Sequence, residues 1–330
     1  MPIDLRTVSI TPLRQTYDHI AARLGADKPA SRYIEGTMDV QAQANFHYRP
    51  TWDPEHLLHD AARTRIVMQD WYALKDPRQL YYGTYTQARA RMQETAEADF
   101  DFVESRGLAD RLDDAARRKA LDFYVPLRHV AWGANMNGAY QCAYGYGTAI
   151  TQPCLYAGMD QLGIAQYLTR LGLLLGNQGE LEACKQAWLE APAWQPLRRL
   201  VEDTWVLKDW FELYVAQNAV LDGALFGLAY KEVDTVLSEQ AGPAVSMLTR
   251  FQAEWFQDAC KWVDAVIKTA AAESDGNRAL LNQWYAHWRG RVQEALAPVA
   301  RLALGDAGAQ ALERSISAVD ARMNKAGLPV

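Results

Sequence analysis

The sequence predicts an all-α protein built as a bundle of unusually long helices. Ala, Leu, Gln, Arg and Glu recur at helical spacing, and no segment shows the period-2 alternation of a strand flanked by turn residues. Several runs continue for about 28 residues, which corresponds to about 42 Å of helix. Helices of that length, recurring in pairs, favour a large bundle over globin-like packing.

Pro and Gly set the first helix boundaries. Asp76 followed by Pro77 is typical of a helix start, with Asp as the N-cap and Pro at the first helical position. The first long helix is therefore expected over 77–105, and Gly107 ends it. A second long helix is expected over 112–140, with an interruption at Pro126.

The later helices follow the same logic. Pro153 and Pro196 are expected to begin helical stretches, and Gly242-Pro243 is expected to break the chain. The remaining long helices are predicted at about 194–221, from the break to about 272, 277–304 and 307–325.

Residues 1–60 differ from the rest of the chain, because they hold five Pro and show no sustained helical periodicity. We predict an irregular N-terminal arm over 1–60 that lies on its own domain or on a partner, and a single helical domain over 61–330. The arm carries aromatic and polar residues in close succession, and its candidate interface residues are Phe46, His47, Tyr48, Arg49 and Trp52.

Composition excludes several classes of protein. With 49% hydrophobic and 22% charged residues, the chain is not intrinsically disordered. Its net charge of −6 argues against a nucleic-acid binder. The N-terminus lacks the apolar core of a signal peptide, and no uncharged apolar run reaches the roughly 18 residues of a membrane span. We therefore expect a cytoplasmic protein with no membrane partner, whose four Cys are reduced.

A long-helix bundle is the usual scaffold of a di-iron carboxylate site, which needs four carboxylates and two imidazoles. Two of its helices each carry a Glu-x-x-His pair, whose spacing places both ligands on one helical face. The only acid-x-x-His match here is Asp53–His56, which lies in the arm. The long helices contain no such pair, so no di-iron site is expected in this chain.

Several short motifs occur in order along most of the chain, namely Leu80-Tyr81-Tyr82-Gly83 before Arg89, Leu127-Arg128-His129, and Asp209-Trp210-Phe211-Glu212 before Gln217-Asn218. They resemble the ligand helices of bacterial multicomponent monooxygenases. Together with Ala30-Ser31-Arg32-Tyr33 and the arm segment 45–54, they are similar to the β subunit of the oxygenase component in the phenol hydroxylase and toluene monooxygenase family.

The resemblance implies a ferritin-like bundle of the ribonucleotide-reductase small-subunit type. It also implies an oxygenase component with two copies each of α, β and γ subunits, served by a reductase and a regulatory (effector) protein. In that family the α subunit holds the di-iron centre and the substrate pocket, and the β subunit binds no metal. The complex hydroxylates phenol and related aromatics with O2 and electrons derived from NADH.

The resemblance also places degenerate ligand positions in this chain, at Arg89, Pro126, His129, Glu212, Asp258 and Lys261. Iron is held by deprotonated carboxylates or neutral imidazoles, whereas Arg89 has no lone pair to offer and Lys261 adds a second cation. Because an unpaired buried charge is costly, we expect Arg89 or Lys261 to pair with Glu212 or Asp258.

We therefore expect a non-catalytic structural subunit that scaffolds a di-iron α subunit and binds no cofactor itself. The alternative is a self-sufficient all-α enzyme with an unrecognised ligand or metal site. The 11 Trp and 16 Tyr are expected to divide between a long-helix core and a large interface with the catalytic subunit.

Overall fold

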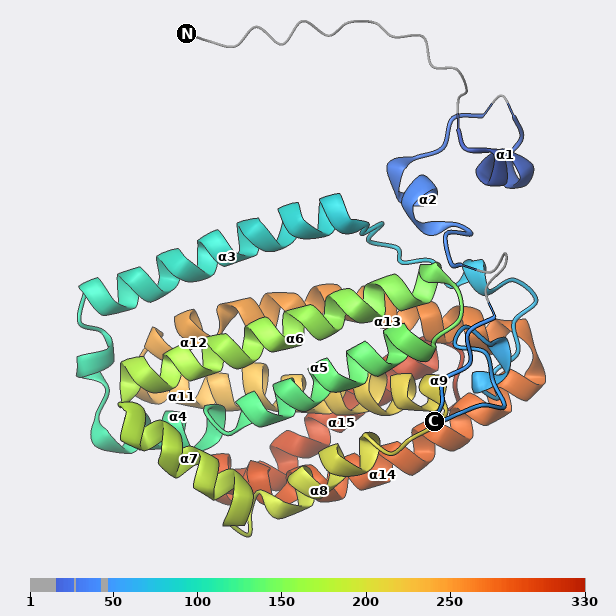
Figure 1. The fold of residues 1–330 in the computed structure, drawn as a ribbon. Coiled ribbons are helices and arrows are strands. Elements are labelled where there is room, and N and C mark those ends of the chain that lie inside the picture. Colours follow the sequence, from blue (N-terminus) through green and yellow to red (C-terminus); the bar gives the residue numbers. More distant parts are fainter. Residues whose placement is uncertain (1–15, 27, 43–46, 330) are drawn as a thin grey trace, which may run out of the picture.

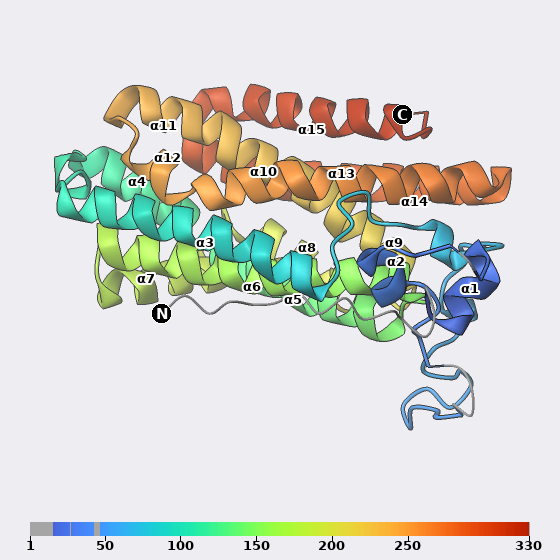
Figure 2. The same cartoon turned by 90° about the horizontal axis from the view of Figure 1, so that it is seen from above.

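The computed structural model describes residues 16–26, 28–42 and 47–329. Within these ranges every regular element is helical, which confirms the all-α prediction. The long helices run lengthwise side by side, with α3 along one edge and α5 and α6 next to each other (Figures 1 and 2). No helix among the described residues is long and apolar enough to cross a membrane.

The longest helices form the body of the bundle, and they are α3 (Tyr82–Ser105), α5 (Leu127–Tyr144), α6 (Thr148–Leu175), α13 (Arg250–Glu273), α14 (Asp275–Leu304) and α15 (Gly308–Lys325). Shorter helices complete the bundle, and they are α4 (Asp114–Tyr124), α7 (Gln178–Glu190), α8 (Gln195–Thr204), α9 (Trp210–Tyr214), α10 (Asp222–Gly227), α11 (Asp234–Ala241) and α12 (Ala244–Leu248). Two more, α1 (Asp18–Leu24) and α2 (Arg32–Thr37), belong to the N-terminal arm and lie beyond one end of the bundle (Figure 1). The chain also has single 3-10 turns at Ala61–Arg63, Trp71–Ala73, Ala109–Arg111 and Gly305–Ala307.

The predicted start of the first long helix is wrong. Asp76 does not cap a long helix, because its carboxylate accepts hydrogen bonds from the backbone and side chain of Arg78. Gln79 then adopts φ of +54°, which a helix does not tolerate. The helix therefore begins at Tyr82, where Thr84 accepts a hydrogen bond from the backbone of Tyr81.

Two other boundaries also differ from the prediction. Pro153 lies inside α6 rather than at its start, because Gly147, with φ of +88°, is the N-cap. The predicted helix over 194–221 is divided at residues 205–209, where Asp209 caps α9 by accepting from the backbone of Phe211 and Glu212. The predicted break at Gly242-Pro243 and the interruption at Pro126 are both confirmed.

The middle of the bundle contains two π-helical segments, at Val215–Leu221 and Leu228–Val233, on either side of α10. A π turn carries an extra residue, so it rotates the side chains that follow it relative to an α-helix. Every residue of the first segment is buried. This segment therefore presents its polar residues to the interior of the bundle.

Most tryptophans belong to the hydrophobic core, where we expected part of them to lie. Eight of the eleven are buried, and they are Trp71, Trp188, Trp194, Trp210, Trp255, Trp262, Trp284 and Trp288. The other three, Trp52, Trp132 and Trp205, are 40–69% exposed. Core packing thus accounts for the larger share of the aromatic excess.

Helices α5 and α6 approach each other closely at Gly138 and Gly158. A Cβ atom added to Gly138 would lie 2.7 Å from the Cα atom of Gly158 and 3.0 Å from the carbonyl oxygen of Cys154. Real carbon atoms do not approach backbone so closely. Glycine at position 138 therefore allows the contact between these two helices.

Replacing Gly138 with Ala is expected to lower the free energy of unfolding by about 1–3 kcal/mol, because the two helices must move apart. Gly163→Ala is the control, since a Cβ atom there meets nothing within 4 Å. That change is expected to be neutral or to stabilise by up to about 1 kcal/mol through helix propensity. Urea titrations of both variants measure the difference, and equal effects would contradict the close-contact account.

Candidate functional site

A network of buried polar side chains lies at the centre of the bundle, between α5, α6 and the first π-helical segment. Asn137 donates through Nδ2 to Oε1 of Gln217 at 2.8 Å and to Oγ1 of Thr204 at 2.8 Å. One helical turn further along α5, Gln141 donates to Oδ1 of Asn218 at 3.0 Å. The first π-helical segment therefore supplies polar partners to α5 at two levels.

Asp222 is the carboxyl group of this network. Gln217 donates to its Oδ1 at 2.8 Å, and Gln161 of α6 donates to the same atom at 3.4 Å. Burial raises the pKa of Asp222 from its ordinary value to about 7, while the two amide donors oppose that rise. Close to neutral pH, the acid is therefore poised between its neutral and charged forms.

The residues of this network do not fit a di-iron centre. Five of the seven are amides, Asn137, Gln141, Gln161, Gln217 and Asn218, one is the hydroxyl of Thr204, and Asp222 is the only carboxyl group. Neutral amides are poor ligands for iron, which is held by carboxylates and imidazoles in such sites. Among the described residues, no three His, Cys, Asp or Glu side chains are grouped so that they could hold a metal ion.

A second buried cluster centres on Asp160 of α6, between α3 and α13. Its carboxylate accepts hydrogen bonds from Tyr85 at 2.9 Å, from Nε1 of Trp255 at 2.8 Å and from Nε of Arg89 at 2.9 Å. Burial raises the pKa of Asp160, and Arg89 with the other donors opposes the rise. The desolvated ion pair between Arg89 and Asp160 joins α3 to α6, and the hydrogen bond from Trp255 joins α13 to the same carboxylate.

The structure brings together only part of the six predicted ligand positions. Nη1 of Arg89 lies 3.8 Å from Oδ2 of Asp258, and Lys261 lies 3.5 Å from the same carboxylate. Of the pairings expected between Arg89 or Lys261 and Glu212 or Asp258, the structure shows those with Asp258. However, Arg89 has a closer partner in Asp160, and the side chain of Lys261 is 67% exposed, so Lys261 is a surface residue.

His129 and Glu212 contact other residues. The ring of His129 stacks on Trp188, and burial lowers the pKa of His129 to about 4, so the imidazole is neutral at pH 7. Glu212 accepts a hydrogen bond from Nε1 of Trp288 at 3.2 Å and lies 3.5 Å from Arg65. Pro126 separates α4 from α5. The predicted correspondence of these positions to iron ligands stays a prediction.

The described part of the arm lies against the chain's own helical body. Nε1 of Trp52 donates to the hydroxyl of Tyr144 at 3.0 Å, and the guanidinium of Arg63 lies over the Tyr144 ring and pairs with Asp53. His47, Tyr48 and Arg49 are exposed, and Arg49 donates to backbone carbonyls of its own loop. Phe46 lies outside the described residues.

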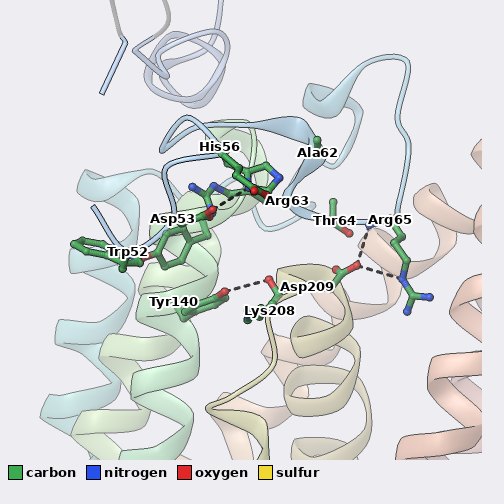
Figure 3. Close-up of a pocket in the computed structure, with 12 residues that line it drawn as sticks. Trp52, Asp53, His56, Ala62, Arg63, Thr64, Arg65, Tyr140, Lys208 and Asp209 are labelled. Atoms are coloured by element: carbon green, nitrogen blue, oxygen red, sulfur yellow. Dashed lines mark hydrogen bonds and ion pairs between the residues drawn. The ribbon is translucent and has the colours of Figure 1, made fainter. Parts of the chain in front are cut away.

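Between the arm and the body lies a surface hollow of about 420 Å³ (Figure 3). Trp52 and Tyr140 line it, and the hydroxyl of Tyr140 donates to the backbone carbonyl of Lys208. Asp209 also lines it and accepts from the backbone of Arg65 at 2.8 Å. The hydrogen bond from Trp52 to Tyr144 holds the arm on the end of α5, and that from Arg65 to Asp209 holds the segment after the arm on the start of α9.

Sequence reasoning missed Asp160 and the role of Asp222. Asp160 is the only Asp, Glu, Lys or Arg between Arg128 and Arg170, so an isolated acid in an apolar helix was the available signal. Asp222 carried a comparable signal, since it is the only Asp, Glu, Lys or Arg between Glu212 and Lys231. The π turn that precedes it, which the sequence does not reveal, sets its inward orientation.

Long paired helices around a buried polar centre define the chain as a ferritin-like helical bundle, as the resemblance implied. A family model described as methane/phenol/alkene hydroxylase matches residues 52–274. The chain belongs to this family, which confirms the resemblance seen in the sequence.

Individual relatives agree with the family. The chain is 48% identical to the oxygenase component MhpL of phenol 2-monooxygenase from Acinetobacter pittii, over 99% of this chain and 98% of the relative. It is equally similar to DmpL, an oxygenase component of phenol 2-monooxygenase from Pseudomonas sp. strain CF600, with the same coverage. A solved structure of phenol hydroxylase from Pseudomonas sp. OX1 superposes with a TM-score of 0.91 at 44% identity and covers 98% of both chains.

Proposed function

We propose that this chain is a non-catalytic structural subunit of the oxygenase component of a phenol-hydroxylating multicomponent monooxygenase. Its relatives at 48% identity are oxygenase components of phenol 2-monooxygenases, and they are matched along nearly their whole length. In this proposal a separate α subunit holds the di-iron centre and the aromatic substrate. The complex contains two copies each of this chain, α and γ, and works with a reductase and a regulatory protein.

The observation that carries the proposal is the chemistry of the bundle centre. Amides occupy it, joined to each other and to Asp222 by hydrogen bonds of 2.8–3.4 Å. Such a network pairs buried amides with one another and with Asp222, and it ties α5, α6 and α10 together. It therefore supports a role in holding the helices rather than in binding iron.

Reconstitution tests this role. We expect the isolated chain to hydroxylate no phenol when the reductase, the regulatory protein, NADH and O2 are supplied. We also expect the kcat/KM of α and γ to fall at least about tenfold without this chain, because the active site of α would lose the neighbouring subunit that keeps its reacting groups in position. Adding the chain back should restore turnover.

The measurement is NADH-coupled catechol formation, with each mixture assayed at equal iron content. Turnover by the isolated chain would contradict the proposal and favour the alternative, a self-sufficient enzyme with an unrecognised site. Full activity of α and γ alone would contradict the structural role.

A further inference from the structure

The exposed side chains of α5 and α6 in this stretch are uncharged. The two helices lie next to each other in the foreground of Figure 1 and at one side of the bundle in Figure 2. We call this surface the α5/α6 outer face, and its exposed residues are Trp132, Met136, Ala139 and Ala143 of α5 and Leu155, Met159, Leu162, Gln166 and Leu173 of α6. The large apolar side chains among them are 40–50% exposed.

The α6 part of this face has the spacing of a coiled-coil seam. Leu155, Met159, Leu162 and Gln166 follow one another at intervals of four, three and four residues, and Leu173 continues the same seven-residue pattern. A repeat of 3.5 residues keeps side chains on one line, where they insert between the side chains of a neighbouring helix. Within the described chain these side chains remain exposed, so the seam has no complete partner there.

Charge is missing from both helices along this face. Between Arg128 and Arg170 the sequence contains no Asp, Glu, Lys or Arg except Asp160, and Asp160 is buried. In a chain with 22% charged residues, a solvent-facing helix pair would normally carry several charges. Loss of charge with enrichment in Trp and Met is typical of the centre of a protein–protein interface.

Trp132 extends the apolar surface beyond α5. Its ring meets that of Trp205 edge to face, with centroids 5.6 Å apart, and the neighbouring Val206 is 77% exposed. Two side-by-side helices of this length present roughly 700 Å² of outer surface, from a width of about 10 Å each and the helical rise. That is close to the roughly 800 Å² that each partner buries in a stable complex.

We propose that the α5/α6 outer face is the surface that binds the metal-holding α subunit of the oxygenase component, through an uncharged pair of long helices on that subunit. The inference rests on the proposed function for the identity of the partner. The seam spacing indicates helices as the occupant, and the absence of charge requires an equally uncharged surface, since a buried charge there would have no partner. A second copy of this chain is the competing occupant.

Leu162→Glu tests the proposal, because it places a charge at the middle of the seam. Leu302→Glu on α14 is the matched control, since Leu162 and Leu302 are both 43% exposed. Binding of each purified chain to the purified α subunit is measured by isothermal titration calorimetry. We expect Leu162→Glu to raise Kd by about 100-fold or more, and Leu302→Glu to change it by less than about threefold.

Folding is checked by circular dichroism and thermal unfolding of each isolated variant, and Met136→Glu on α5 repeats the test from the second helix. Wild-type affinity for both Leu162→Glu and Met136→Glu would overturn the inference, while activity and iron location could still support the proposed function.

Analytical ultracentrifugation tests whether a second copy of this chain occupies the face. A stable homodimer of the isolated chain that Leu162→Glu converts to monomer would assign the face to a second copy and overturn the choice of partner.

Discussion

Replacing Asp160 with Ala is expected to lower the free energy of unfolding by about 3–5 kcal/mol, because it leaves the guanidinium of Arg89 buried without its carboxylate. The Arg89 side chain is only 12% exposed, and that of Asp160 is 4% exposed. Tyr85 and Trp255 would also lose their shared acceptor. Urea titration of the isolated chain measures the change.

The control for this prediction is Glu202→Ala, which removes an exposed ion pair with Arg198 on α8. Exposed pairs of this spacing contribute about 0.5 kcal/mol or less. Replacing Arg89 and Asp160 together by Met and Leu should recover part of the loss, since no unpaired charge remains. A loss below about 1 kcal/mol for Asp160→Ala would contradict the view that this cluster joins α3, α6 and α13.

Replacing Asp222 with Asn is expected to stabilise the chain more at pH 8 than at pH 5, by roughly 3 kcal/mol. Burial raises the pKa of Asp222 to about 7, so the native chain keeps this proton at pH values where the unfolded chain releases it. The stabilising contribution of the neutral acid is complete below about pH 4 and is lost as the pH rises through 7. The full change is on the order of 4 kcal/mol.

Asn imitates the protonated acid, since its carbonyl oxygen can accept from Gln217 and Gln161 as Oδ1 of Asp222 does. The measurement is the difference in free energy of unfolding between variant and wild type across pH 5–8.5. Asp275→Asn removes the same charge from a side chain that is 97% exposed, and it should change stability by less than about 0.5 kcal/mol at either end. A difference for Asp222→Asn that does not vary with pH would show that the acid is already charged in the native chain.

Local chemistry was enough to predict the fold class and several boundaries. Pro126 and Gly242-Pro243 interrupt helices because proline removes a backbone donor and glycine adopts positive φ, with φ of +80° at Gly242. Asp76-Pro77 failed as a helix start because Asp76 binds Arg78, a contact that the spacing of residues does not reveal.

The arrangement of the amides at the bundle centre could not be predicted from the sequence, for a different reason. Gln217 and Asn218 belong to one of the motifs that carry the resemblance, yet an amide in a helical pattern can lie on the surface or in the interior. The first π-helical segment shifts the register that an ideal helix would predict, and Gln217, Asn218 and Asp222 point inward. Lys261, which the resemblance places at a ligand position, has a side chain that is 67% exposed.

The location of iron tests the central claim most directly. The chain and the α subunit are purified separately after expression in iron-supplemented medium, and each is analysed for iron by mass spectrometry. We expect stoichiometric iron in α and none above background in this chain, whose bundle centre offers amides around a single carboxyl group. If the isolated chain held stoichiometric iron and Asp222→Asn removed that iron, the chain would bind the metal itself and the proposed structural role would be contradicted.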